Sequence, residues 1–313
     1  MVEFAGRGRG HAPVADLRAA LTGVPTTVAA APSRPLRAEA LLAASLLTPA
    51  LLLVALLLLV PLLWLVWQSV RQDGGFTLAH YARLFTDPAY GATFLQTFRI
   101  SAIVTLACVV LGFPVAWAAA ESGPTLRTLI LALVVLPLWT SVLVRAYAWI
   151  IVLQRTGLVN SALEALGVIH RPVILVNNEF GTIVATTHIL MPFVVLPLYT
   201  TIRTIPREVL AAAASLGGTP AFVFTRVYLP LSLPGLLSGA SLVCVLSLGF
   251  YITPELLGGG RTYTVSMLIA RNIALYDEWG AASSVSVALL ACIFLIFFLA
   301  GRIVPIDRIV GTR

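Results

Sequence analysis

Long apolar stretches without a formal charge alternate along this chain with shorter segments that carry its Arg, Asp and Glu residues. A membrane-spanning helix needs about 20 such residues. The uncharged stretches of this length are Ala40–Val70, Ile100–Ala120, Thr128–Val144, Phe180–Ile202, Val227–Pro254 and Trp279–Gly301. The pattern predicts an all-α polytopic membrane protein with six transmembrane helices. We place the spans at Leu41–Trp67, Thr93–Ala120, Leu126–Leu153, Phe180–Ile202, Leu231–Glu255 and Ala281–Ile303.

A further uncharged stretch, Val209–Thr225, lies between the fourth and fifth predicted spans. Gly217, Gly218 and Pro220 at its centre are typical of a loop rather than of a seventh span. We therefore predict a short helix from Arg207 to Leu216, a turn and a second helix along the membrane surface. Pro230 is expected to end this element before the fifth span. The alternative is a re-entrant or surface segment with a structural role alone.

Shorter features fall between and inside the spans. The segment Thr77–Pro88 has the pattern of a short amphipathic helix, and Val159–Leu166 is expected to form another on the same side. Pro192 and Pro197 are expected to bend the fourth span, since proline removes a helical hydrogen bond.

Composition supports the membrane class, with 59% hydrophobic and 11% charged residues against about 25% charged in soluble domains. All basic residues are Arg. With a cytoplasmic N-terminus, twelve Arg fall on inner segments and six on outer ones, as the positive-inside rule requires. The net charge of +7 therefore needs no nucleic-acid partner. We expect both termini in the cytoplasm, with a flexible tail over 1–38, a membrane domain over 39–308 and a short tail over 309–313.

The chain lacks the residues that would make it an enzyme on its own. Cys108, Cys244 and Cys292 lie in apolar spans without metal-ligand spacing, and we interpret them as small buried hydrophobes. The chain contains no Lys and no G-x-x-x-x-G-K-[ST] motif for nucleotide phosphates. Nor does a nucleophile–base pair appear in the sequence. We expect no metal and no cofactor on this chain.

Residues 206–235 resemble the EAA loop of permeases from ATP-binding-cassette (ABC) importers. The positions that match are Ala212, Ala213, Gly217 and the segment Val227–Pro230. The glutamate of the motif falls on Ala211, which is a departure, and Glu208 lies nearly one helical turn earlier. Whether Glu208 takes its place stays open.

Other short motifs resemble the spermidine/putrescine permease subunits of that superfamily, over about residues 45–305. These motifs are Pro137–Thr140, Arg145–Tyr147, Met191–Phe193, Pro197–Tyr199, Gly249–Tyr251, Leu256–Gly259 and Trp279–Ala282. The resemblance implies the type I ABC importer permease fold, in a bacterial cytoplasmic (inner) membrane. It also implies an ABC ATPase dimer that binds ATP and Mg, a second permease subunit, a periplasmic or extracellular solute-binding protein and a small-molecule cargo of the polyamine type.

The resemblance assigns coupling to the ATPase to the cytoplasmic loop between spans four and five, residues 206–230. The coupling candidates are Arg207, Glu208, Ala211, Ala212, Ala213, Gly217 and Pro230. Small alanine side chains allow the close approach of another helix, and Gly217 suits a turn that needs a positive φ. Closure of the ATPase would then move the loop as a rigid body and rock the spans.

Seven residues are candidates for the translocation pathway. They are Trp139, Arg145, Tyr147, His188, Tyr199, Tyr251 and Glu255. Arg145 is an ionisable group inside a span, where it either pairs with Glu255 or extends to the outer headgroups. Aromatic faces attract amines, although such rings also serve as packing residues or interfacial anchors. A single His such as His188 is more often a hydrogen-bonded packing residue than a ligand.

Other functions stay open from the sequence. The same machine could carry an aminophosphonate, an opine or amino acid, or an anion, because the binding protein sets most of the selectivity. A self-contained secondary transporter or channel would need its own ionisable groups. Among the Arg, His, Asp and Glu residues, only Arg99, Arg145 and His188 lie away from the ends of the predicted spans, and no acidic residue lies deep in one. This weighs against proton coupling.

Overall fold

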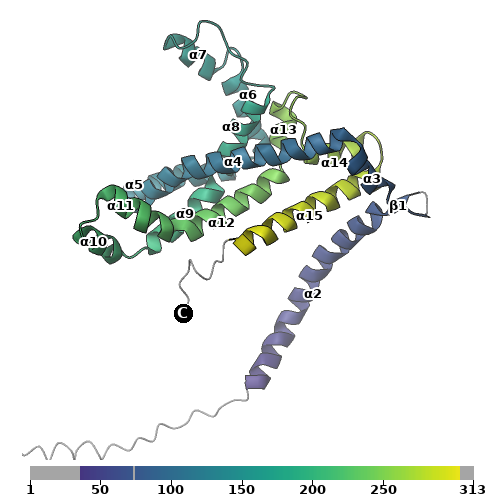
Figure 1. Ribbon diagram of the computed structural model, residues 1–313, viewed down its shortest axis with the longest axis horizontal. Helices are drawn as coiled ribbons and strands as arrows, with labels where there is room; N and C mark the ends of the chain where they lie inside the picture. Colours follow the sequence, from purple (N-terminus) through teal and green to yellow (C-terminus); the bar gives the residue numbers. More distant parts are fainter. Residues whose placement is uncertain (1–35, 73–74, 304–313) are drawn as a thin grey trace, which may run out of the picture. The chain divides into compact units, whose positions relative to one another are not determined.

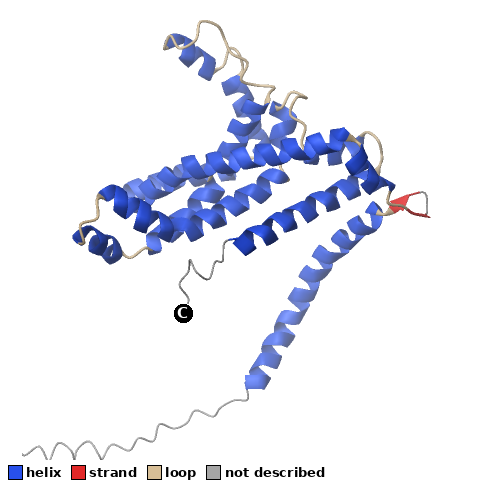
Figure 2. Ribbon diagram, viewed as in Figure 1, coloured by secondary structure: helices blue, strands red, loops and turns tan. Residues whose placement is uncertain are grey.

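The computed structural model describes residues 36–72 and 75–303, which are helical apart from a short hairpin (Figure 2). The elements in chain order are α2 (Leu36–Ser69), β1 (Arg71–Gln72), β2 (Gly75–Phe76), α3 (Ala79–Thr86), α4 (Pro88–Glu121), α5 (Pro124–Val135), the short helix η1 (Leu136–Trp139), α6 (Val142–Leu153), α7 (Leu158–Ala165), α8 (Glu179–Leu190), α9 (Pro192–Thr204), α10 (Arg207–Ser215), α11 (Pro220–Val223), the π-helical turn η2 (Phe224–Tyr228), α12 (Leu229–Leu248), α13 (Ile252–Leu257), α14 (Val265–Ala274) and α15 (Trp279–Ile303).

The chain divides into two units, with the boundary after Pro61 in helix α2. In the first unit the side chains from Ser45 to Pro61 are all exposed, and most are apolar. An apolar helix without a buried face is what a lipid-facing span requires. The tail predicted over 1–38 lies outside the described residues up to position 35, and its last three residues belong to α2. The tail predicted over 309–313 also lies outside them.

The second unit has α4 at its centre, packed against α8, α9 and α12 (Figure 1). One buried cluster includes Val104, Ile189 and Val243, one from each of α4, α8 and α12. Helices α9 and α12 approach closely at Gly239, where a Cβ atom would stand 2.8 Å from Cα of Val194. Small residues allow such close contact between membrane helices.

Two further clusters organise the second unit away from this centre. Tyr90 of α4, Val265 of α14 and Val285 of α15 form one of them. Helices α6, α8 and α13 meet in the other, around Ala185 and Leu257. The predicted short helices at Thr77–Pro88 and Val159–Leu166 are confirmed as α3 and α7.

The number of predicted spans agrees with the structure. In the described part of the chain, five helices are long and apolar enough to cross a membrane, and six if the bent pair α8–α9 counts as one span. The two members of that pair are inclined by 41°. The bend falls at Met191–Pro192, which confirms the predicted effect of Pro192. Pro197 lies inside α9.

The third span is not the continuous helix predicted over Leu126–Leu153. Helix α5 passes into η1, and an extended step at Thr140 and Ser141 precedes α6. Pro137 cannot donate a backbone hydrogen bond, which weakens the helix at this point. The Thr140 hydroxyl donates to the carbonyl of Pro137 over 2.7 Å and satisfies one of the groups that the break frees.

The fifth span also differs from the prediction. The helix runs without a break from Pro220 through α11, η2 and α12 to Leu248, so Pro230 does not end the coupling element. The π turn at Phe224–Tyr228 widens the helix just before Pro230, which relieves the crowding of the proline ring against the preceding turn. The span ends at Gly249 rather than at Glu255, which belongs to the separate helix α13.

Segments that were predicted on one side of the membrane share one end of the second unit. Figure 1 shows α10 and α11 at the end where α4 passes into α5, and α3, α13 and α14 away from that end. A short turn joins the two helices there, because α4 ends at Glu121 and α5 begins at Pro124.

Candidate functional site

The loop between spans four and five begins with α10, and its end has the geometry that the sequence predicted. Gly217 has φ +87°, a value that L-residues with a side chain rarely adopt. Its N–H donates to the carbonyl of Ala214 over 3.0 Å, and the Gly218 N–H donates to that of Ala213 over 3.1 Å. This paired pattern is a Schellman cap, which ends the helix and turns the chain back.

The second half of the loop restarts directly after this cap. The Thr219 hydroxyl accepts a hydrogen bond from the N–H of Phe222 over 3.3 Å and caps the start of the helix. Pro220 occupies the first turn, where its missing N–H costs nothing. The first helix and the turn predicted between spans four and five are therefore present, whereas the second helix is the start of the fifth span and not a separate surface helix.

The loop presents apolar and small side chains on its surface. Leu216 is 90% exposed and Phe222 is 52% exposed. The predicted coupling residues Arg207, Glu208, Ala211, Ala212, Gly217 and Pro230 are exposed, and Ala213 is half-buried. Glu208 lies in the first turn of α10, where a carboxylate favours the positive end of the helix dipole. A Cβ atom at Gly217 would meet no other heavy atom within 4 Å.

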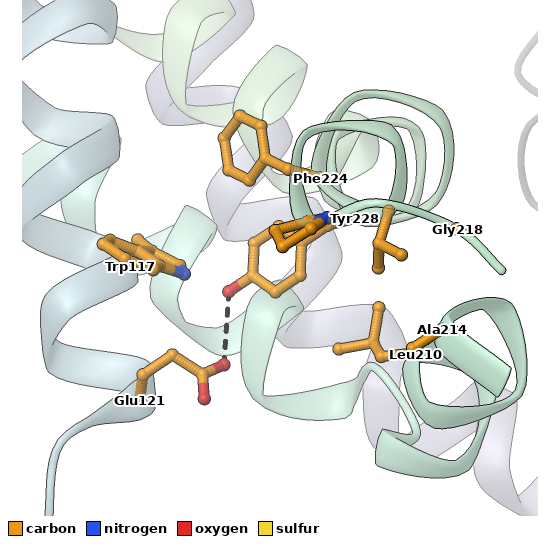
Figure 3. A pocket seen from close by; sticks show the side chains of 9 residues that line it. Trp117, Glu121, Leu210, Ala214, Gly218, Phe224 and Tyr228 are labelled. Carbon is orange, nitrogen blue, oxygen red and sulfur yellow. Dashed lines mark hydrogen bonds between the residues drawn. The ribbon is translucent and has the colours of Figure 1, made fainter.

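The carboxylate of Glu121, at the C-terminal end of α4, contacts both ends of the loop. Its Oε2 lies 3.5 Å from a guanidinium nitrogen of Arg207, the first residue of α10. Its Oε1 accepts a hydrogen bond from the Tyr228 hydroxyl over 3.5 Å, from the last residue of η2 (Figure 3).

A pocket of about 480 Å³ lies between the loop and the inner end of α4. Figure 3 shows Trp117, Phe224 and Tyr228 around it, with Leu210 on the side of α10. The Phe224 and Tyr228 rings stack with centroids 5.8 Å apart. The loop therefore rests on aromatic side chains without closing fully against α4.

The pathway candidates Arg145 of α6 and His188 of α8 line one pocket. Its volume is about 210 Å³, and Ala148, Trp149 and Val152 complete its lining. The Trp149 indole N–H donates to Nδ1 of His188 over 3.2 Å. His188 is thus a hydrogen-bonded residue, and Nε and Nη1 of Arg145 are hidden from solvent without a hydrogen-bond partner among the described residues.

The predicted ion pair between Arg145 and Glu255 is wrong. No salt bridge joins them in the described part of the chain, although α6 and α13 pack together. The Glu255 side chain is exposed on α13, because the fifth span ends earlier than predicted. A different intramembrane charge is paired instead, since Arg99 of α4 forms an ion pair with Glu179 of α8.

The aromatic candidates differ in their surroundings. Trp139 on η1 is 88% exposed, Tyr147 on α6 is 56% exposed and Tyr251, in the break after α12, is 40% exposed. Tyr199 on α9 is half-buried and packs against the core at the inner end of the spans. The rings of Trp139, Tyr147 and Tyr251 are therefore accessible from outside the chain, whereas the ring of Tyr199 packs inside it.

Cys108 is buried, and its Sγ–H donates a hydrogen bond to the carbonyl oxygen of Thr187 over 3.4 Å. Across residues 36–72 and 75–303, no three His, Cys, Asp or Glu side chains come close enough together to hold a metal ion. All three cysteines are free thiols.

Three residues of these sites were missed from the sequence. The sequence did not single out Glu121 or Trp149, and Tyr228 entered only as part of the motif segment Val227–Pro230. A signal existed for Trp149, which lies one helical turn after Arg145 and on the same face. For Glu121 the sequence offered no signal, because its partners lie 86 and 107 positions further along the chain.

Comparison with known proteins decides the class. Residues 109–306 match the family described as the inner membrane component of binding-protein-dependent transport systems. The chain belongs to this family. It is therefore a multi-pass transport subunit, an ABC importer permease of the inner membrane.

The permease is 35% identical over 231 residues to the spermidine/putrescine transport system permease protein PotB of Salmonella typhimurium (strain SL1344), covering 73% of this chain and 80% of that protein. It is 30% identical over 257 residues to the inner membrane ABC transporter permease protein YdcU of Escherichia coli (strain K12), covering 75% and 82%. Its fold is similar to that of a chain in the crystal structure of a bacterial ABC importer of alginate. That comparison has a TM-score of 0.65 and 19% identity, and covers 85% of this chain and 96% of that chain.

Proposed function

We propose that this permease forms half of a translocation pathway for a polyamine of the spermidine/putrescine type. Support for the cargo comes from the name and 35% identity of the PotB relative. The exposed rings of Trp139, Tyr147 and Tyr251 provide faces that attract alkylammonium groups, and Glu255 provides an exposed carboxylate. Arg145 has no place beside a cationic cargo, and we assign it to the structure of the outer half-spans with His188.

The partners follow from the same proposal. A second permease subunit completes the pathway, a periplasmic or extracellular binding protein delivers the cargo, and an ABC ATPase dimer supplies the energy. ATP and Mg bind to the ATPase, and this chain contributes no ligand to them. Both termini lie in the cytoplasm.

The coupling segment, defined as Arg207–Tyr228, is the part of the permease that binds the ATPase. The observation that carries this assignment is the exposed surface at the capped turn. Leu216 is 90% exposed, Ala211 and Ala212 are exposed beside it, and Gly217 leaves open space where a partner can approach. An exposed apolar surface of this kind marks a contact with another protein.

Movement of the coupling segment has a direct route into the spans. The helix is continuous from Pro220 into α12, and α12 packs against α4 and α9. A displacement of α11 during ATPase closure therefore moves the inner end of the fifth span with it. Alternating access follows as these spans rock about their packed contacts.

The experiment is uptake into proteoliposomes that hold the complete transporter, with ATP and Mg inside and the loaded binding protein outside. We expect uptake of radiolabelled putrescine or spermidine that is blocked by an excess of either amine and unaffected by an opine or an aminophosphonate. Uptake of one of those other solutes in place of the amines would overturn the cargo.

The same vesicles test the coupling segment through Gly217→Trp. The new side chain enters open space in this chain, where a docked partner would meet it, and it also carries the strain of a side chain at φ +87°. Gly217→Asn is the matched control, because asparagine tolerates a positive φ. Gly217→Trp is expected to assemble and insert but to lose transport, whereas Gly217→Asn retains it. Equal uptake by both variants would refute the docking surface.

A further inference from the structure

Glu121 lies outside the recognised loop motif, yet its carboxylate contacts both ends of the coupling segment. Arg207 begins α10, and Tyr228 ends the π turn that leads into α12. The two contacts come from different carboxylate oxygens, Oε2 for Arg207 and Oε1 for Tyr228. We infer that Glu121 is a positioning residue, which fastens the coupling segment to α4 so that its motion reaches the spans; this rests on the proposed function.

Each charge of this ion pair lies at the unfavourable end of its own helix. Glu121 is the last residue of α4, where the dipole already carries negative charge. Arg207 is the first residue of α10, where the dipole carries positive charge. Neither charge therefore benefits its own helix. Both are stabilised when the C-terminal end of α4 and the N-terminal end of α10 meet.

Apolar packing holds the end of the coupling segment against α4 more than its start. Neither α10 nor α11 has a buried residue, and the pocket of about 480 Å³ lies between them and the end of α4. Tyr228 is the buried exception at the end of η2, at 5% exposed. Phe224 also packs its ring edge to face against Phe113 of α4, with centroids 5.8 Å apart. The end of the segment is thus packed on α4, whereas, among the described residues, α10 contacts the apolar cluster around Tyr228 only through the half-buried Leu210, beside the ion pair of Arg207.

The nearby cation Arg127 does not take this role. Its guanidinium donates to the carbonyl of Ser122 over 3.0 Å and so satisfies the end of α4. In the described part of the chain, the Glu121 carboxylate forms its ion pair with Arg207 and its hydrogen bond with Tyr228. A charge reversal at Glu121 should therefore be repaired by a reversal at Arg207.

The test uses the complete transporter in proteoliposomes. Three variants are compared with wild type: Glu121→Arg, Arg207→Glu and the double variant that carries both substitutions. Two quantities are measured: the cargo moved per ATP hydrolysed, and the hydrogen exchange of α10 amides in the assembled complex. Each single variant is expected to lower the cargo moved per ATP by about fivefold or more. The double variant is expected to restore this ratio to within about twofold of wild type. The hydrogen exchange of the α10 amides is expected to be faster in each single variant and to return toward the wild-type rate in the double variant.

The matched control is the exchange Arg99→Glu with Glu179→Arg, an ion pair that also involves α4 but lies toward its other end. Neither this double variant nor its single members should change the exchange of α10 amides. Singles that match wild type, or a double as impaired as the singles, would overturn the inference. If the wild-type complex moves no polyamine, the proposed cargo fails, whereas the amide exchange still reads the Glu121 contact.

Discussion

Trp149 on α6 donates its indole N–H to Nδ1 of His188 on α8 over 3.2 Å, and the two rings meet edge to face with centroids 5.5 Å apart. The contact joins the outer parts of two spans that are both interrupted, at Thr140–Ser141 and at Met191. It therefore adds a polar contact to the apolar cluster that already joins these two segments.

Removing this hydrogen bond should lower stability in a way that depends on the partner. Trp149→Phe leaves Nδ1 of His188 without its donor and is expected to cost about 1–2 kcal/mol in the free energy of unfolding. His188→Phe should cost a similar amount, and the double variant less than the sum of the two. Thermal unfolding of the purified permease in detergent measures these differences. Strict additivity would show that the two side chains do not interact.

The close approach of α9 and α12 gives a second prediction. Gly239→Ala places a Cβ atom 2.8 Å from Cα of Val194, which the packed backbones cannot absorb without shifting. We expect a loss of about 1–3 kcal/mol in stability. Gly249→Ala is the control, because a Cβ atom there meets nothing within 4 Å. The same unfolding assay compares the two, and equal effects would contradict the packing argument.

The cap at Thr219 gives a third prediction. Thr219→Ala removes the hydroxyl that accepts from the Phe222 N–H, and the start of α11 should lose about 1 kcal/mol of local stability. Amide exchange over residues 220–228 should then quicken by about fivefold. Thr128→Ala, in the first half of α5, removes a hydroxyl bonded within its own helix and should leave that segment unchanged. Unaltered exchange in Thr219→Ala would mean that the cap does not hold the turn.

The sequence predicted the positions of most spans because charge-free length alone marks a lipid-crossing segment. Its failures came at prolines. Pro137 breaks the third span into two halves, since an extended step follows it, whereas Pro230 is accommodated by a π turn and leaves the fifth span continuous. Whether a proline breaks, bends or merely widens a helix depends on which neighbours satisfy the freed groups. That information is in the packing and not in the local pattern.

The features of the candidate site also differ in how far the local sequence predicts them. The Schellman cap at Gly217 was predictable, because the glycines and the preceding alanines are local signals. The pairing of Arg145 with Glu255 was wrong, because it assumed a fifth span that continued to residue 255. The contact of Glu121 with Arg207 and Tyr228 was beyond reach, because it joins segments far apart in the chain.

The central claim is that the ATPase binds the coupling segment. Cross-linking from position 216 tests this claim directly. A photoreactive amino acid replaces Leu216, which is 90% exposed beside Gly217, and the complete transporter is irradiated in the membrane. The matched position is Leu166, which is 76% exposed at the end of α7. We predict a covalent adduct with the ATPase from position 216 and none from position 166. An adduct from 166 and none from 216 would contradict the account.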